Sequence, residues 1–246
     1  MMEGIPANKS VTVLNIAATL VPLKYSITII VSSRSKVDEK QDFIKNIDET
    51  CGVEHRLIFI TNNGHSLTQV YNNILPMVST EIVVFLHDDI EFLKHGWGEE
   101  VVRLFKENQE YGIIGVAGSA EFDEKGAWWQ YKNIYGQVMH KNNGKVWLSA
   151  FSPLLDEDLK EVCVIDGVFM AIHTKRIVEN FDNNLEGFHM YDIEFCLSNF
   201  LSRQVKIGVT TNIRLAHYSI GQLSDQWFVN KDYVTEKFKN NYPIRV

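Results

Sequence analysis

Cysteine is scarce in the 246-residue chain. The three cysteines, Cys51, Cys163 and Cys196, lie far apart and show no metal-ligand spacing. Disulfide frameworks and cysteine-ligated metal sites both need cysteines at characteristic spacings. The sequence therefore argues against both, and we expect buried free thiols in a protein of a reducing compartment.

The chain also lacks a long apolar run. A membrane helix needs about 20 consecutive apolar residues. The nearest candidate, residues 11–23, is shorter, contains Asn15 and meets Pro22 near its end. We therefore expect residues 1–24 to form an N-terminal extension that packs on the domain, not a signal peptide. Membrane contact is expected to be peripheral at most.

Positive charge is in deficit as well. The chain has 24 Lys and Arg against 31 Asp and Glu, a net charge of -7 and a pI near 5.6, and no basic stripe runs along it. These features argue against a nucleic-acid partner. No glycine-rich phosphate loop follows the first apolar run, which counts against a dinucleotide dehydrogenase and a P-loop enzyme. A serine-centred nucleophile elbow is absent too.

What the sequence does contain is a regular alternation of apolar β-rich runs and amphipathic segments. Runs that are apolar on both faces indicate a parallel sheet covered by helices. The expected fold class is therefore α/β, a single Rossmann-like domain with a mostly parallel central sheet flanked by helices. The elements expected in the first half are strands at 25–33, 55–63, 81–89 and 112–119 and helices at 36–49, 66–78 and 97–109.

The second half changes character, with loops rich in Trp, Gly and Asn. Residues 142–144 (Asn-Asn-Gly) predict the turn of a β-hairpin. No repeat or linker interrupts the chain, so a single domain over 25–246 with an elaborated second half is the simplest interpretation. The other elements expected there are strands at 161–172, 206–210 and 213–219 and helices near 189–203 and 224–239.

Polar residues follow three of the predicted strands, at 32–34, at Asn62 and at 87–89. In open α/β sheets, ligands bind at the carboxyl ends of the strands. Side chains alternate along a strand, so His87 and Asp89 should point one way and Asp88 the other. An imidazole with carboxylates suits Mn²⁺ or Mg²⁺. The alternative is a turn acid that accepts hydrogen bonds from nearby amides.

Four more residues are candidates for chemistry, each with a structural alternative. Asp192 lies near a helix start beside aromatic residues and could be a general base, or a solvated acid favoured by the helix dipole. His217 follows a short apolar strand and is either a ligand or a structural histidine. Asp166 interrupts an apolar strand, where a buried charge must be paired or functional, and Gly167 would allow close backbone approach. Asp166 could instead accept hydrogen bonds from a neighbouring loop.

Five stretches, in this order, resemble the family 2 glycosyltransferases of the A-type fold, in the bacterial branch with a His-X-Asp variant of the Asp-X-Asp motif. The resemblance covers about residues 25–240 and implies a nucleotide-sugar-binding half at 25–119 and an acceptor-binding half at 120–246. The stretches are FLHDDIEF, GSAEFDEKGAWW, VIDGVFMAI, GFHMYDIEFCL and AHYSIGQLSDQW.

The resemblance also implies roles for individual residues. Asp89 and His217 match the metal ligands, and Asp192 matches the catalytic base of the Glu-Asp motif, with Tyr191 in place of its Glu. The family often has an acidic pair after the second strand, whereas this sequence has two amides at 62–63. The resemblance therefore does not indicate which nucleotide is bound. The residues expected to bind the nucleotide sugar are Ser32, Arg34, Asn62, His87, Asp88 and Asp89. Those expected on the acceptor side are Trp128, Trp129, Asp166 and Gly167.

The activity implied is an inverting, cation-assisted transfer of a sugar from a nucleoside diphosphate sugar to a hydroxyl of a glycan or lipid-linked acceptor. Such bacterial proteins commonly build surface polysaccharides in the cytoplasm, at the inner face of the membrane. Two other readings stay open. One is a catalytically silent relative that binds a nucleotide sugar or glycan, and the other is a metal-dependent nucleotidyl or phosphoryl transferase.

Overall fold

The computed structural model describes residues 11–16, 26–62, 64–152, 157–202, 205–219 and 223–246. Of the predicted N-terminal extension it describes only strand β1 (Val11–Ile16), which runs antiparallel to β3 (His55–Asn62). The extension thus adds a strand to the edge of the main sheet. The remainder of the extension, together with Asn63 and Gly221, lies outside the described residues.

The main sheet has eight strands in the order β1-β3-β2-β4-β13-β6-β14-β11. Strands β2, β3, β4, β6 and β14 run in one direction, and β1, β13 and β11 run against them. The sheet is therefore mixed, although its larger set of strands is parallel as expected. The strands not yet placed are β2 (Ile27–Ser33), β4 (Ile82–Leu86), β6 (Tyr111–Gly115), β11 (Lys160–Val162), β13 (Phe169–His173) and β14 (Lys206–Val209).

Strand β13 occupies the middle of this sheet, antiparallel to both β4 and β6. The sequence predicts one strand over 161–172, but the structure divides this stretch into β11, β12 (Val164–Ile165) and β13. The division is needed because the chain crosses from the sheet edge at β11 to its centre at β13. Since Phe169 pairs with Leu86, the loop 166–168 reaches the carboxyl end of β4.

A second sheet has six strands in the order β12-β7-β9-β15-β5, with β10 paired to β9. The predicted hairpin is confirmed: β9 and β10 turn at Asn143 and Gly144, whose φ values are 49° and 73°. A small sheet pairs β16 (Ile244–Arg245) with β8 (Glu121–Phe122). The remaining strands are β5 (Ile90–Phe92), β7 (Ala117–Ser119), β9 (Ile134–Asn142), β10 (Lys145–Ala150) and β15 (Leu215–His217).

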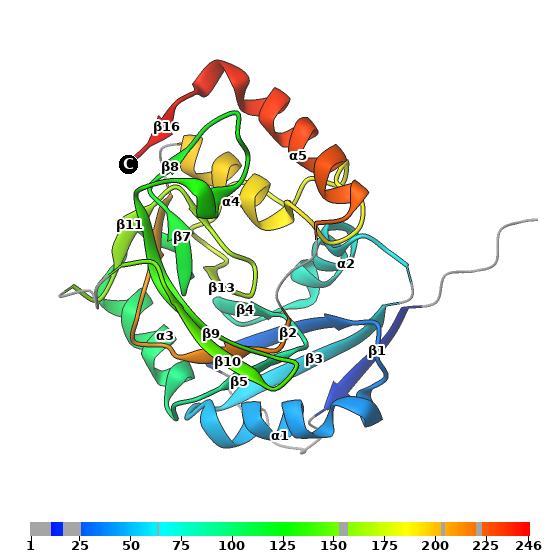
Figure 1. The fold of residues 1–246 in the computed structure, drawn as a ribbon. Coiled ribbons are helices and arrows are strands. Elements are labelled where there is room, and N and C mark those ends of the chain that lie inside the picture. Colours follow the sequence, from blue (N-terminus) through cyan, green and yellow to red (C-terminus); the bar gives the residue numbers. More distant parts are fainter. Residues whose placement is uncertain (1–10, 17–25, 63, 153–156, 203–204, 220–222) are drawn as a thin grey trace, which may run out of the picture.

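In the part of the chain that the structure describes, five α-helices form where the apolar spacing predicts them. In α1, for example, Phe43, Ile44 and Ile47 are buried on one face. In Figure 1, α1 lies below the main sheet, and α2 and α4 lie above it. The α-helices are α1 (Gln41–Thr50), α2 (Leu67–Ile74), α3 (Trp97–Glu107), α4 (Tyr191–Leu201) and α5 (Asp225–Phe238). The 3₁₀ turns are η1 (Val37–Lys40), η2 (Leu75–Met77), η3 (Trp128–Gln130) and η4 (Lys239–Asn241).

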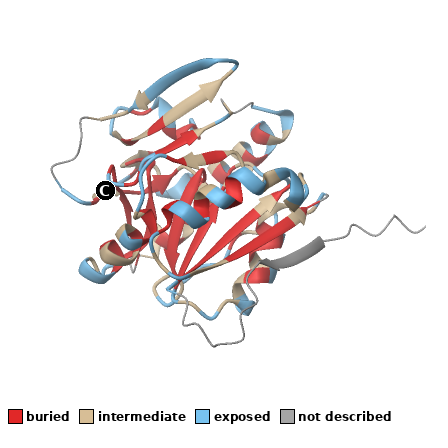
Figure 2. Cartoon of the chain, turned by 90° about the horizontal axis from the view of Figure 1, so that it is seen from below, coloured by how far each residue is buried: buried red, intermediate tan, exposed pale blue. Residues whose placement is uncertain are grey.

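The core lies in the central strands of the main sheet. All residues of β4, β6 and β13 are buried. Figure 2 shows strands at the centre of the molecule in red. Helices cover both faces of these strands, as the continuous apolar runs predict. The three cysteines are buried and free, as expected. Within the described residues, no helix is long and apolar enough to span a membrane.

Candidate functional site

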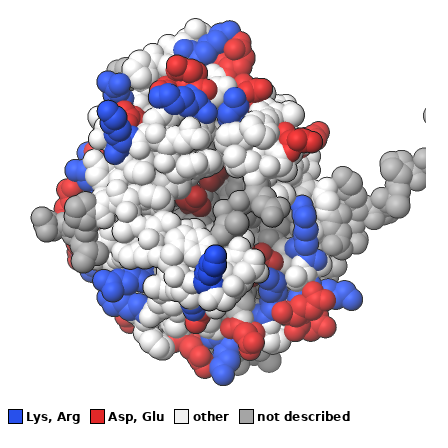
Figure 3. All heavy atoms as spheres, viewed as in Figure 1, with Lys and Arg blue, Asp and Glu red and all other residues white. Residues whose placement is uncertain are grey.

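The face of the molecule seen in Figure 1 is hollowed near its centre. Figure 3 shows acidic side chains at the floor of this hollow and mostly uncharged atoms around it. Three chain segments meet at the carboxyl end of β4: the residues after β4, the loop 166–168 before β13, and the end of β15. The amide of His87 donates a hydrogen bond to the carbonyl of Val168 at 3.3 Å, which joins the first two segments.

The third segment is joined to the first by strand pairing. Strand β15 runs antiparallel to β5, with His217 opposite Ile90. The amide of Tyr218 donates to the carbonyl of Asp89 at 2.9 Å. The turn after β4 and the last residue of β15 therefore present their side chains to the same space, although they lie far apart in sequence.

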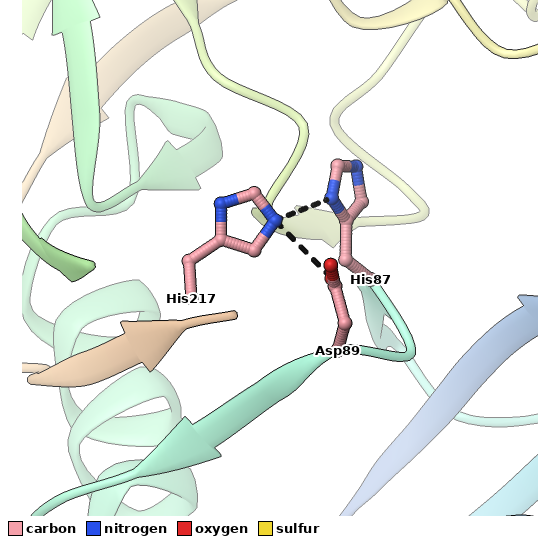
Figure 4. Close-up of side chains that lie close together, drawn as sticks. All are labelled: His87, Asp89 and His217. Carbon is pink, nitrogen blue, oxygen red and sulfur yellow. Dashed lines mark hydrogen bonds and ion pairs between the residues drawn. The ribbon is translucent and has the colours of Figure 1, made fainter. Parts of the chain in front are cut away.

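His87, Asp89 and His217 point toward one another in this space (Figure 4). Nε2 of His217 lies 3.1 Å from Oδ1 of Asp89 and 3.5 Å from Nδ1 of His87. One potential ligand atom from each residue lies within 4.8 Å of the others. Two imidazole nitrogens and a carboxylate oxygen fit a divalent transition metal such as Mn²⁺ better than Mg²⁺, which prefers oxygen.

The charges of these residues depend on one another. Burial alone would raise the pKa of Asp89, but the hydrogen bond from His217 and the charges of both histidines lower it to about 2. Burial would likewise lower the pKa of His217, but Asp89 and more distant carboxylates outweigh burial and raise it. Burial and the charge of His217 lower the pKa of His87. Asp89 is thus ionised at neutral pH and available to a cation.

Asp88 points away from this cluster, as the strand alternation predicts. Its carboxylate accepts a short hydrogen bond from the hydroxyl of Ser33, and Nζ of Lys40 lies 3.2 Å from its Oδ2. Lys40 also donates to the backbone carbonyl of Asp88 at 2.8 Å. Asp88 therefore ties the turn after β4 to the end of β2, and its carboxylate is satisfied within the chain.

Asp192 lies in the first turn of α4 and faces the loop before β13. Its Oδ2 accepts a hydrogen bond from the amide of Gly167 at 2.7 Å, and its Oδ1 accepts one from the amide of Ile193 at 2.9 Å. Burial and the charge of Asp166 raise the pKa of Asp192 to about 7, against these two hydrogen bonds. A half-buried carboxyl with such a pKa exchanges protons readily near neutral pH.

Asp166 lies close enough to the histidine cluster and to Asp192 to act on both. Its charge acts on His87 and His217 as well as on Asp192. Its Oδ1 accepts a hydrogen bond from the amide of Val168 at 2.9 Å, so the donor belongs to its own loop, whereas the structural alternative expected a neighbouring loop. The two groups of candidate residues, one for a cation and one for a proton, therefore share a single acidic hollow.

Comparison with known proteins identifies the family of this chain. The model of the glycosyltransferase like family matches residues 26–242. The chain belongs to this family. A curated relative, ATP synthase subunits region ORF 6 of Fuscovulum blasticum, is 22% identical over 184 residues, which cover 72% of this chain and 67% of the relative.

A solved structure supports the A-type fold of this glycosyltransferase-like chain. The crystal structure of GalNAc-T7 with UDP, GalNAc and Mn²⁺ matches with a TM-score of 0.52 and 9% identity. The match covers 86% of this chain and 48% of that one, so the chain spans about half the length of GalNAc-T7. At this identity the likeness concerns the fold alone.

Ser32, Arg34 and Asn62, the three residues expected to contact the nucleotide, lie at the carboxyl ends of β2 and β3. The side-chain amide of Asn62 donates to the hydroxyl of Ser32 at 3.2 Å and to the carbonyl of His65 at 2.8 Å. Arg34 is exposed, and its guanidinium lies 5.2 Å from the ring centre of Phe188. Arg34 thus approaches the segment that leads into α4 and Asp192.

The two tryptophans expected on the acceptor side differ in exposure. Trp128 is 5% exposed and packs edge-on against Phe151, whereas Trp129 is 39% exposed and lies 6.0 Å from Trp227 between ring centres. Only Trp129 of this pair presents a ring to solvent.

Sequence reasoning about the glycosyltransferase-like chain missed His140 and Trp147. They face each other across the β9–β10 hairpin with rings stacked 5.1 Å apart, and His140 lies 6.0 Å from His217. Their opposition follows from the hairpin register, which the predicted turn could have indicated. The approach of His140 to His217 could not be predicted, because it depends on the parallel pairing of β9 with β15.

Proposed function

We propose that the chain transfers a sugar, with inversion, from a nucleoside diphosphate sugar to a hydroxyl of a glycan or lipid-linked acceptor. The observation that carries this proposal is the shared acidic hollow: a cation-binding set next to a carboxyl whose pKa is about 7. Such a pair suits a reaction in which one group leaves with negative charge while another loses a proton.

The donor would bind to the first half of the chain, residues 25–119. Ser32, Arg34 and Asn62 would contact the nucleotide. Asp89, His217 and His87 would hold the divalent cation, which neutralises charge on the leaving diphosphate when bound. Asp88 would act indirectly, since its contacts with Ser33 and Lys40 hold the turn that carries these ligands. The GalNAc-T7 structure, which contains UDP and Mn²⁺, supports a donor of this class.

Asp192 would be the general base. It would accept the proton of the acceptor hydroxyl as the oxygen attacks the anomeric carbon on the face opposite the diphosphate. One base is enough, because a diphosphate leaves without needing protonation. The amides of Gly167 and Ile193 orient the carboxylate, and burial with Asp166 keeps its proton affinity high enough to take a proton.

The acceptor would bind to the second half of the chain, residues 120–246. Trp129 offers an exposed ring on which a sugar could stack. Asp166 and Gly167 would line the acceptor side next to the base. Trp128 would support this region from the interior.

A thermal-shift screen of nucleoside diphosphate sugars, with and without Mn²⁺, tests the proposal first. A ligand that binds only the folded protein raises its melting temperature. We expect one donor to stabilise the protein in a Mn²⁺-dependent way, and Asp89→Ala to remove this effect. Asp232→Ala, at an exposed position of α5, is the matched control and should respond like the wild type.

Product analysis with the stabilising donor then separates the activities. Release of the nucleoside diphosphate, with the sugar on an acceptor, supports glycosyl transfer. Release of pyrophosphate or free phosphate would indicate nucleotidyl or phosphoryl transfer and overturn the proposal. Donor binding without turnover on any acceptor or water would indicate a silent binding protein.

A further inference from the structure

Gly167 is held from both sides by two consecutive residues of α4. The hydroxyl of Tyr191 donates a hydrogen bond to the carbonyl of Gly167 at 3.1 Å. The amide of Gly167 donates to Oδ2 of Asp192 at 2.7 Å. A Cβ at position 167 would collide with the Tyr191 hydroxyl, so only glycine allows the two segments to approach this closely.

Tyr191 has little freedom to leave this position. It is 3% exposed, and its ring meets that of Tyr71 nearly edge-on, with centres 5.7 Å apart. Burial raises the pKa of Tyr71, and the hydroxyl of Tyr191 opposes this larger effect. Met190, just before α4, has a φ of 65°, a conformation that non-glycine residues rarely adopt and that is found preferentially at functional sites.

We propose that Tyr191 is a positioning residue for the general base: its hydroxyl fixes the backbone of Gly167, so that the Gly167 amide stays aimed at Asp192 and sets the proton affinity of that carboxylate. This inference rests on the proposed function, in which Asp192 takes the acceptor proton. Tyr191 itself takes no part in the proton transfer.

The same phenol also acts on Asp166. The carbonyl that accepts the Tyr191 hydrogen bond and the amide of Val168 belong to one peptide group, and that amide donates to Oδ1 of Asp166 at 2.9 Å. Hydrogen bonds at the two ends of one peptide group strengthen each other. Tyr191 therefore steadies both carboxylates that flank Gly167.

The direction of the effect follows from these contacts. The titratable groups around Asp192 are Asp166 on the loop before β13, Tyr71 on α2, and Tyr191 and Cys196 on α4. The charge of Asp166 favours protonated Asp192. The amide of Gly167 opposes it by stabilising the carboxylate. Loosening Gly167 should therefore raise the proton affinity of Asp192.

Carboxyl ¹³C NMR titration of the full-length protein tests this without a substrate. The Asp192 resonance is assigned by its loss in Asp192→Asn. In Tyr191→Phe we expect the midpoint of this resonance to move to higher pH by about one unit, a tenfold gain in proton affinity. Tyr71→Phe removes the hydroxyl next to that of Tyr191 and should shift the Asp192 midpoint in the same direction by a smaller amount. This variant replaces Tyr191→Phe in the test if Tyr191→Phe does not fold.

Tyr131→Phe is the matched control. Tyr131 is also buried, and its hydroxyl donates to Oδ1 of Asp123 at 2.8 Å, so the variant loses a comparable hydrogen bond elsewhere. Its Asp192 midpoint should equal that of the wild type. An unchanged midpoint in both Tyr191→Phe and Tyr71→Phe, or an equal shift in Tyr131→Phe, would overturn the positioning role.

Activity measurements keep this inference separable from the proposed function. If Asp192→Asn retains full turnover, the base assignment fails, whatever the titration shows. If Asp192→Asn is inactive and Tyr191→Phe keeps the wild-type pH profile, only the positioning role fails. Support for both requires an inactive Asp192→Asn, together with a Tyr191→Phe whose acid limb in kcat moves to higher pH while KM for the donor is unchanged.

Discussion

Nζ of Lys237 on α5 lies 2.6 Å from Oε1 of Glu194 on α4, and Glu194 is 1% exposed. Lys237 also contacts Oδ2 of Asp182 at 2.7 Å. The other oxygen of Glu194 has no hydrogen-bond partner among the described residues. One cation thus joins the C-terminal helix to the helix that begins with Tyr191 and Asp192.

Removal of this cation should destabilise the protein strongly. Lys237→Met leaves the buried Glu194 carboxylate with only the hydroxyl of Ser198 as a partner in the described part of the chain. Loss of one member of a buried pair costs about 3–5 kcal/mol, and the partial exposure of Lys237 places the expected loss at the low end of that range. Adding Glu194→Gln should recover most of this loss. Urea unfolding followed by circular dichroism measures both. Lys239→Met, at an exposed pair with Glu236, should change the free energy of unfolding by less than about 1 kcal/mol.

Replacement of the proposed base should remove turnover and spare donor binding. Asp192→Asn keeps the shape of the side chain but cannot accept the proton, so we expect kcat to fall by about 10²–10⁴-fold. The donor dissociation constant should stay within about twofold of the wild-type value, because Asp192 forms no hydrogen bond with the residues proposed to bind the nucleotide. In the wild type, kcat should fall below about pH 7, where Asp192 is protonated. Exposed Asp232→Asn controls for a general effect of charge removal.

Asp192 should also make stability depend on pH. Its pKa is about 7 in the folded protein and near 3.9 when unfolded, so the folded state binds the proton more tightly between these values. The contribution of Asp192 to the stability of the wild type is therefore lost as pH rises through this window, and Asp192→Asn lacks this contribution. Between pH 5 and 8, the free energy of unfolding of the wild type should fall relative to that of the variant by roughly 2.6 kcal/mol. Parallel pH curves for the two proteins would contradict the raised pKa.

Cation binding should discriminate between two neighbouring histidines. His217→Gln removes a proposed ligand and should weaken Mn²⁺ binding by at least about tenfold. His140→Gln, one strand away, should leave the affinity within about twofold of the wild type. The wild type should bind Mn²⁺ more tightly than Mg²⁺, because two of three ligands are imidazoles. Electron paramagnetic resonance of free Mn²⁺ measures each affinity, and equal losses in both variants would refute the assignment.

Much of this arrangement could be predicted from local sequence. The apolar run of β4, followed by His87 and Asp89, indicates a strand end with two side chains on one side, and both join one cluster in the structure. The helix that begins near Asp192 follows from its apolar spacing. The position of β13 between β4 and β6 does not follow, because periodicity identifies a strand but not its neighbours. The contact between Tyr191 and Gly167 depends on the position of β13, so it could not be predicted from the sequence either.

The place of β13 also has a consequence for the order of assembly during synthesis. The ribosome releases β2, β3, β4 and β6 before it makes residues 169–173. Until those residues arrive, β4 and β6 have no partner between them, and each presents an open edge to other chains. A fragment that ends before β13 would keep these open edges and should aggregate. The strand that fills this gap follows closely on Asp166 and Gly167, so these two residues reach the site as the gap closes, whereas Asp192, β14 and His217 are made later.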